Sequence, residues 1–253
     1  MDLYEAIEKR ISCRAYDDRP IEDEKRDALR TEIARINEDP DLHFQLVGPR
    51  EDGTAIDMNK KMFAGDIRWY VALAACKDPV VEEKLGYFGE RLVLLATTLG
   101  LGTCWVASTY DHDTVRVELE KGEMLHDVIP LGYAPAKTPV KQRAIRAGIR
   151  RSDKKKEQMY SGPTPLAEAP EWIRAGIDAV HAGPSAINEQ PVVIVQDASD
   201  APVRATLPKV ERGLEYTDMG IAKLHFELAA KAHGIEGTWE WGEGGAFRVL
   251  RKD

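Results

Sequence analysis

Two stretches of the chain share one pattern of apolar and small residues. The segments GYFGERLVLLATTLGLGTCW (86–105) and GIAKLHFELAAKAHGIEGTW (220–239) align without a gap at an offset of 134 residues. Each is typical of a long helix that is apolar on almost every side, ended by a glycine and followed by a short extended segment. Such helices are buried in the middle of a fold. The matched glycine and tryptophan positions favour an internal duplication. The alternative is chance similarity between two helices rich in leucine and alanine.

The segments that precede these helices also correspond. The runs RWYVALAA (68–75) and QPVVIVQ (190–196) are β-branched or aromatic and predict strands. Residues 19–29 and 164–177 each place a proline before a helix-like stretch. A basic, polar run lies between the halves and predicts a linker. The pattern therefore predicts an α+β fold of two related units, 1–145 and 163–253, joined by a linker over 146–162.

Composition narrows the class of protein. Hydrophobic residues make up 43% and charged residues 31% of the 253 residues, which is ordinary for a globular protein. A net charge of −8 argues against general affinity for nucleic acid or anionic membranes, although a local basic pocket remains open. No run resembles a signal peptide or a membrane span. The three cysteines, Cys13, Cys76 and Cys104, match neither a disulfide framework nor a metal site, so we expect a cytoplasmic protein without a metal.

A cluster of like charges stands near the start of the chain, in RISCRAY (10–16). Arg10 and Arg14 flank Ser12 at a spacing of two residues, and guanidinium groups this close repel one another. Either an anion bound among them or screening by water makes the arrangement tolerable. Arg is suited to a phosphate because its forked donors match the oxygens.

The second half carries a different polar motif, AGPSAINEQP (182–191). Gly183-Pro184-Ser185 predicts a turn, and the short polar side chains that follow lead into an apolar strand. The amides and hydroxyls of such a loop can form hydrogen bonds with the edge of a planar heterocycle, although the loop can equally be a plain helix-to-strand connection. The first half lacks this loop, and the second half lacks the R-x-S-x-R cluster. Two fused units could thus form one composite site.

These motifs resemble those of the flavin-dependent nitroreductase family. KRISCRAYDDRPI is similar to the family's N-terminal signature for the phosphate of FMN, and AGPSAINEQP is similar to its second flavin-binding motif. The two long helices resemble its central dimer helix, and IPLGYAPAKTPVKQR (129–143) resembles its closing segment. The resemblance covers nearly the whole chain. It implies an α+β nitroreductase-like fold, in the branch where two units are fused in one chain as a pseudo-dimer with central antiparallel sheets.

The resemblance also implies roles for individual residues. Arg10, Ser12 and Arg14 would contact the FMN phosphate and ribityl chain, and Lys141 and Arg143 would close on the phosphate. The ring would be lined by the loop, through Pro184, Ser185, Ala186 and Asn188, with Gln190 near it. No side chain is implied as a catalytic acid or base. Asn59 and Lys61 could lie at the ring's pyrimidine edge or be solvated, and GEGGAFR (242–248) could approach the cofactor or be a turn.

The implied function is that of an FMN-binding oxidoreductase. NADH or NADPH would reduce the flavin, and a nitro compound, a quinone or a similar small electrophile would then take the electrons in a ping-pong cycle. The alternative is a degenerate relative that binds flavin or a partner without turnover. We expect a small-molecule acceptor, no nucleic acid or membrane as partner, and a monomer (pseudo-dimer) or weak homodimer. A Rossmann interpretation of GLGTCW is disfavoured because it follows a helix instead of a strand.

Overall fold

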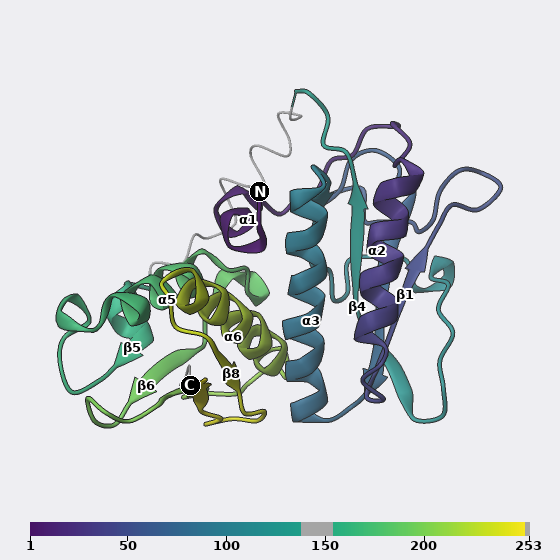
Figure 1. Ribbon diagram of the computed structural model, residues 1–253. Coiled ribbons are helices and arrows are strands. Elements are labelled where there is room, and N and C mark those ends of the chain that lie inside the picture. Colours follow the sequence, from purple (N-terminus) through teal and green to yellow (C-terminus); the bar gives the residue numbers. More distant parts are fainter. Residues whose placement is uncertain (138–153, 251–253) are drawn as a thin grey trace. The chain divides into compact units, whose positions relative to one another are not determined.

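The computed structural model describes residues 1–137 and 154–250, and the chain forms two compact units (Figure 1). Within the described residues, unit 1 holds Met1, Lys9–Lys77 and 91–137, and unit 2 holds Asp2–Glu8, Asp78–Glu90 and 154–250. Unit 2 thus takes in two pieces of the first half of the sequence. The helix predicted at 86–99 begins earlier, as α3 (Pro79–Thr98), and its residues are shared between the units.

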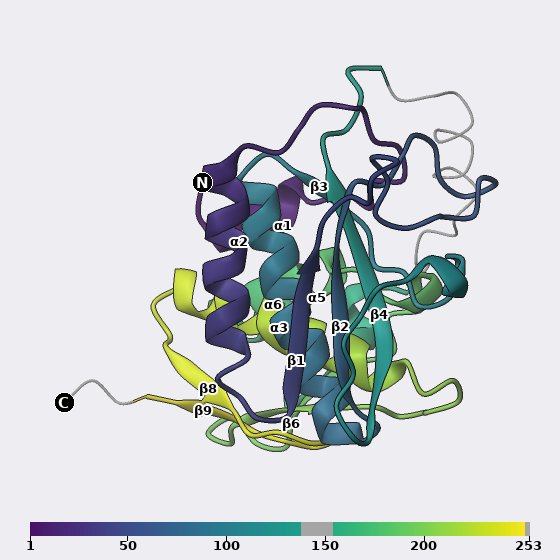
Figure 2. The same cartoon turned by 90° about the vertical axis from the view of Figure 1, so that its right-hand side faces the viewer.

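Unit 1 is built on a four-stranded antiparallel sheet in the order β1-β2-β4-β3. Its strands are β1 (Leu42–Val47), β2 (Trp69–Cys76), β3 (Gly102–Thr103) and β4 (Glu123–Gly132). The predicted strand at 68–75 is confirmed as β2, which is buried on both faces along most of its length because it is central. Helix α2 (Asp23–Ile36) lies along β1 (Figure 2), and the short turn η1 (His112–Thr114) precedes β4.

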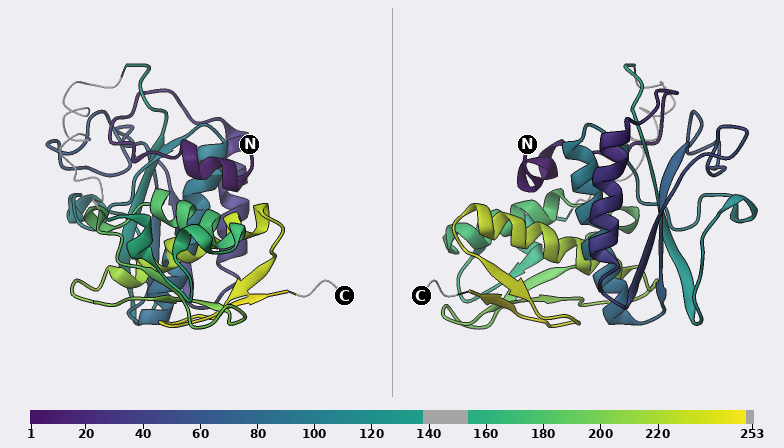
Figure 3. Two further views of the ribbon diagram at one scale, coloured as in Figure 1. Left: turned by 90° about the vertical axis from the view of Figure 1, so that its left-hand side faces the viewer. Right: turned by 45° about the vertical axis from the view of Figure 1, so that its right-hand side comes forward.

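Unit 2 combines a small mixed sheet with two packed helices. The sheet has the order β5-β6-β7, from β5 (Tyr160–Ser161), β6 (Val193–Gln196) and β7 (Val203–Thr206). Helices α5 (Glu171–Ala182) and α6 (Glu215–Ala232) pack against each other, and α6 contacts the hairpin of β8 (Gly237–Trp239) and β9 (Phe247–Val249) (Figure 3). The remaining elements are α1 (Leu3–Lys9), η2 (Lys156–Met159), η3 (Leu166–Glu168) and η4 (Ala186–Asn188).

Part of the predicted linker is instead a structural element of unit 2. Residues 154–161 form η2 and β5, and β5 pairs in parallel with β6. The reason is two apolar residues within the polar run, since Met159 and Tyr160 are both buried in the unit 2 core. The rest of the predicted linker, up to residue 153, lies outside the described residues.

The ends of the two long helices follow the predicted pattern. Helix α3 is followed by Gly100 at φ +77° and α6 by Gly234 at φ +82°, a left-handed conformation that glycine adopts freely. A strand begins shortly after each glycine, β3 and β8 respectively. Trp239 packs against Phe226 and Phe247 and donates its indole N–H to the Lys223 carbonyl at 2.8 Å, so it is a packing residue of the unit 2 core.

Candidate functional site

The arginine segment, residues 10–16, runs extended in unit 1 and is fixed by its backbone. Ser12 forms a parallel bridge with Thr103, and the Cys13 amide donates to the Thr103 carbonyl at 2.7 Å. On its other edge, the Arg14 carbonyl accepts from the Ala64 amide at 2.9 Å, and the Tyr16 amide donates to the Ala64 carbonyl at 3.0 Å. The segment therefore lies between β3 and the turn at residues 64–65.

Side chains alternate along this segment, as they do along any extended chain. Cys13 and Ala15 are buried, whereas Ser12 and Arg14 are half-buried and lie on the opposite side. The Tyr16 hydroxyl donates to the carbonyl oxygens of Cys13 at 2.9 Å and Pro130 at 3.1 Å. Burial of this phenol raises its pKa, so it stays a neutral donor. The buried side chains anchor the segment and leave the polar ones for a ligand.

A buried thiol, Cys104, lies beside the arginine segment. Burial raises the pKa of Cys104 to about 11, and the charges of Arg14 and Arg10 and a hydrogen bond with Ser12 oppose that rise. Arg10, Ser12 and Arg14 belong to the same extended segment, and their joint contact with a phosphate stays a prediction. Because the Cys104 thiol is buried and neutral at ordinary pH, it is a packing group here and not a nucleophile.

Two glycines make room for the arginine segment. A Cβ on Gly65 would overlap the Tyr16 carbonyl oxygen, and Gly65 also has φ +78°. A Cβ on Gly102 would lie 2.8 Å from both Cβ and Sγ of Cys13. Close backbone approach on both sides explains how a short polar segment is held without a long strand of its own.

The loop predicted to bind the ring, residues 184–190, has an unusual backbone in unit 2. Ile187 (φ 45°), Asn188 (φ 61°) and Gln190 (φ 48°) are the three non-glycine residues with positive φ in the described chain. Left-handed conformations cost L-residues on the order of 1–2 kcal/mol, and a β-branched residue such as Ile187 is a true outlier. The Ile187 side chain is 66% exposed, so burial of that side chain does little to offset the cost. Backbone strain of this kind clusters at functional sites.

Side chains of unit 2 fix this loop. The Ala186 amide donates to the Asp218 carboxylate at 2.9 Å, and the Gln190 amide donates to Ser185 Oγ at 2.9 Å. The Gln190 side-chain amide donates from Nε2 to the His181 carbonyl at 2.5 Å. Lys154 Nζ donates to the Gln190 carbonyl at 2.7 Å. Four hydrogen bonds to protein groups thus hold the backbone of the loop.

One polar atom of the loop has no partner. Gln190 is 5% exposed, and its Oε1 is buried without a hydrogen bond in the part of the chain that the structure describes. A buried acceptor left unpaired costs about 1–3 kcal/mol. A ligand that donates a hydrogen bond to Gln190 Oε1 would remove that cost.

Asp218 and Lys154 hold this loop from outside it, and sequence reasoning missed both. Asp218 is buried at the start of α6, far along the chain from the loop. Lys154 fell in the predicted linker, and burial lowers its pKa. A polar residue at the beginning of an otherwise apolar helix was the only available signal. The predicted residues Lys141 and Arg143 lie outside the described residues, and the joining of the unit 1 and unit 2 segments into one site stays a prediction.

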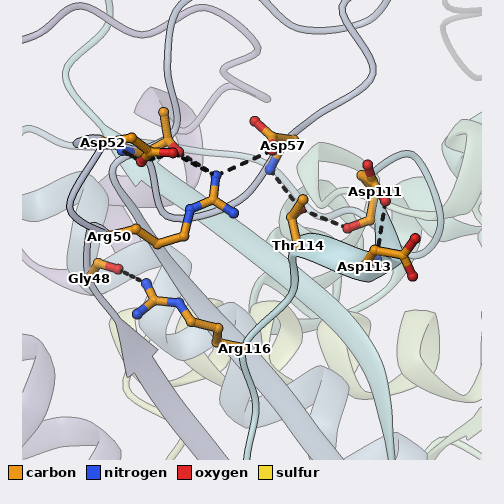
Figure 4. A network of polar contacts seen from close by, with 9 residues as sticks. Gly48, Arg50, Asp52, Asp57, Asp111, Asp113, Thr114 and Arg116 are labelled. Carbon is orange, nitrogen blue, oxygen red and sulfur yellow. Dashed lines mark hydrogen bonds and ion pairs between the residues drawn. The ribbon is translucent and has the colours of Figure 1, made fainter.

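A hollow lies in unit 1, beside residues 54–67, with a volume of about 240 Å³. Asp57, one of its two acidic lining residues, accepts a hydrogen bond from Arg50 Nη2 at 3.3 Å, and the Asp57 amide donates to Thr114 Oγ1 at 3.0 Å (Figure 4). Asn59, which could have faced the ring edge, accepts the Lys61 amide through its Oδ1 at 2.9 Å in a local turn. No cluster of metal-ligating side chains occurs in residues 1–137 and 154–250.

Helix α6 also carries two fully buried polar pairs. Lys223 Nζ contacts the Glu83 carboxylate and donates to the Glu240 carbonyl at 2.9 Å. Burial raises the pKa of Glu83 and lowers that of Lys223, and the charge of each opposes the shift of the other. His225 lies 2.9 Å from the Ala179 carbonyl through Nδ1 and 3.0 Å from Glu90 through Nε2. The Ala179 carbonyl can only accept, so Nδ1 carries a hydrogen.

The α3 and α6 helices cross in unit 2 at equivalent glycines. A Cβ on Gly86 would overlap the Thr217 carbonyl, and a Cβ on Gly220 would overlap the Glu83 carbonyl. The pairs 83/217 and 86/220 are both separated by the repeat offset of 134 residues. The contact is therefore reciprocal, as in an isologous interface, where residue i meets j and j meets i.

Comparison with known proteins identifies relatives. The family model described as "Putative TM nitroreductase" matches residues 2–230. A solved Thermotoga maritima structure, titled a putative nitroreductase, is similar at 20% identity and a TM-score of 0.66, covering 99% of this chain and 94% of that one.

Two further relatives match part of the chain. A "Putative NADH dehydrogenase/NAD(P)H nitroreductase" of Methanothermobacter thermautotrophicus is 30% identical over 155 residues, covering 55% of this chain and 80% of that protein. A nitroreductase structure from Bacteroides fragilis, titled with bound FMN, is 19% identical with a TM-score of 0.42, covering 61% of this chain and 100% of that one. Because the family model covers most of the sequence and the fold agrees, the chain belongs to the family described as "Putative TM nitroreductase" and has an α+β nitroreductase-like fold.

Proposed function

We propose that this protein is an FMN-binding oxidoreductase that uses NADH or NADPH to reduce nitro compounds, quinones or similar small electrophiles. The observation that carries the proposal is the loop at 184–190 in a member of the nitroreductase family, with its left-handed residues and a Gln190 Oε1 that has no hydrogen-bond partner among the described residues. When bound, FMN would supply the redox chemistry, taking a hydride from the nicotinamide and passing electrons to the acceptor.

The residues present fit the cofactor. Arg10, Ser12 and Arg14 are half-buried residues of one extended segment of unit 1, and together they offer a donor set suited to a phosphate dianion. In unit 2, Gln190 Oε1 is a buried acceptor that an N–H or O–H of a bound molecule could satisfy. The backbone groups of Ala186 are already used within the protein, the amide toward Asp218 and the carbonyl toward the Glu189 amide. Ala186 would therefore contact a ring through its methyl group alone.

We further propose that the chain arose by fusion of two nitroreductase units. The reciprocal Gly86 and Gly220 contacts support this, because a chance similarity of two helices gives no reason for symmetry-equivalent close approaches. Under this proposal the arginine segment of unit 1 and the loop of unit 2 serve a single flavin.

A direct test is to purify the protein and look for flavin absorbance, with and without added FMN, and then to add NADH or NADPH anaerobically. Binding of FMN, bleaching by a reduced nicotinamide and recovery of colour on adding a nitroaromatic or a quinone are expected. Binding without bleaching would favour the alternative of a degenerate, flavin-binding relative. No binding would overturn the proposed function.

A second test separates the two segments by comparing FMN with riboflavin, which lacks the phosphate. Arg14→Gln should weaken FMN binding about tenfold or more and leave riboflavin binding unchanged, because one charge-assisted contact is lost. Asn188→Ala should weaken both ligands to a similar extent. Arg19→Gln is the control, since Arg19 is exposed and pairs with Asp17. Equal effects of Arg14→Gln on the two flavins would contradict the assignment of the phosphate.

A further inference from the structure

The carboxylate of Asp218 contacts the 184–190 loop, which holds the three non-glycine residues of the described chain with positive φ. Asp218 is 6% exposed at the start of α6, and both of its oxygens are within hydrogen-bond distance of the Ala186 amide, at 2.9 and 3.2 Å. Ala186 is the residue directly before the left-handed pair Ile187 and Asn188. A hydrogen bond to a charged acceptor is about twice as strong as a neutral one.

The hydrogen bond between the Ala186 amide and Asp218 lies at the beginning of the turn. Ser185 is extended, at φ −149° and ψ 163°, and the chain reverses within the next three residues. The Ser185 carbonyl accepts from the Asn188 amide at 3.0 Å, and Ser185 Oγ accepts from the Gln190 amide at 2.9 Å. These bonds close the turn on itself, whereas the Asp218 contact ties the beginning of the turn to α6.

We propose that Asp218 is a positioning residue that holds the 184–190 loop in its ligand-binding conformation before any ligand arrives. The proposal rests on the proposed function for the identity of the ligand, FMN. The physical basis is preorganisation, since a strained loop that is already fixed has no ordering cost to meet when it binds. Without the Asp218 acceptor, the left-handed residues would relax toward ordinary backbone conformations.

The first experiment needs no flavin. Hydrogen exchange of the loop amides is measured in the flavin-free full chain for wild type, Asp218→Asn and Asp218→Leu. Asp218→Asn keeps an oxygen acceptor and should keep most of the protection, whereas Asp218→Leu should speed exchange of the Ala186 amide about tenfold or more. Asp178→Ala is the matched control, because Asp178 is an exposed carboxylate of unit 2 that pairs with Lys156. Unchanged exchange in Asp218→Leu would overturn the proposal.

The second experiment measures FMN affinity by titration of flavin fluorescence on the same variants. Affinity should fall about tenfold or more in Asp218→Leu and be restored largely in Asp218→Asn, a recovery that a general loss of packing would not give. Faster exchange with unchanged FMN affinity would overturn the proposal. Failure of the wild-type protein to bind FMN would overturn the proposed function, while the exchange result would still decide whether Asp218 fixes the loop.

Discussion

The arginine segment of unit 1 and the loop of unit 2 are held in place by different means. Residues 10–16 are extended, and main-chain hydrogen bonds to Thr103 and Ala64 hold them, with two glycines letting other backbone approach. Residues 184–190 are folded back on themselves, with three left-handed residues held by the side chains of Ser185, Gln190, Asp218 and Lys154. The first segment should therefore be sensitive to backbone changes and the second to single polar side chains.

The largest effect on the free energy of unfolding is expected at the buried ion pair between Lys223 of α6 and Glu83. Lys223→Met would leave the Glu83 carboxylate buried without its cation, and removing one partner of a buried ion pair costs about 3–5 kcal/mol. Urea unfolding would measure this loss. The double variant Lys223→Met/Glu83→Leu is the control and should recover most of the stability, because it leaves no buried charge. A double variant as unstable as the single one would contradict this account.

Gly65→Ala should have the next largest effect, on unit 1. The added Cβ overlaps the Tyr16 carbonyl oxygen, and φ +78° adds strain, so we expect a loss of about 3 kcal/mol in free energy of unfolding. Gly53→Ala is the matched control, because Gly53 has φ +84° with nothing within 4 Å of its Cβ position. That variant should cost about 1 kcal/mol. Equal losses in the two would show that the close approach to the arginine segment does not matter.

Ser185→Ala tests the side-chain dependence of the loop directly. The Gln190 amide would lose its hydrogen-bond acceptor, Ser185 Oγ. Because Gln190 is buried, this loss should lower the free energy of unfolding by about 1–3 kcal/mol. Thermal unfolding and exchange of the Gln190 amide measure the change, with Ser161→Ala at an exposed position of β5 as the control. A Ser185→Ala protein with wild-type exchange at Gln190 would mean that the turn is held by other contacts.

The smallest effect has the opposite sign. Ile187→Asn should stabilise unit 2 by about 0.5–1 kcal/mol, because asparagine tolerates the left-handed region and the isoleucine side chain is 66% exposed. Val210→Asn, at an exposed residue without positive φ, should change stability little. If Ile187→Asn destabilises the protein as measured by urea unfolding, the left-handed backbone at 187 is not a source of strain.

Among the described residues, no helix has both the length and the apolar content to cross a bilayer.

Two polar side chains of the long helix α6 are buried inside unit 2. Lys223 and His225 lie within the mostly apolar helix α6, and both are fully buried against carboxylates. A lysine within an apolar run is ambiguous until its partner is known, and Glu83 is 140 residues away.

The sequence by itself determined the two long helices with their glycine ends, the central strand β2, the strand β6 and the clustering of Arg10, Ser12 and Arg14, because these depend on periodicity and local spacing. It also proposed the 184–190 loop as part of a flavin site, an assignment that stays a prediction. Only the tertiary structure decided how that loop is held, since Asp218 and Lys154 come from distant segments, and that residues 154–161 are part of unit 2. Contacts between residues far apart in the chain leave no local pattern, so sequence periodicity cannot specify them.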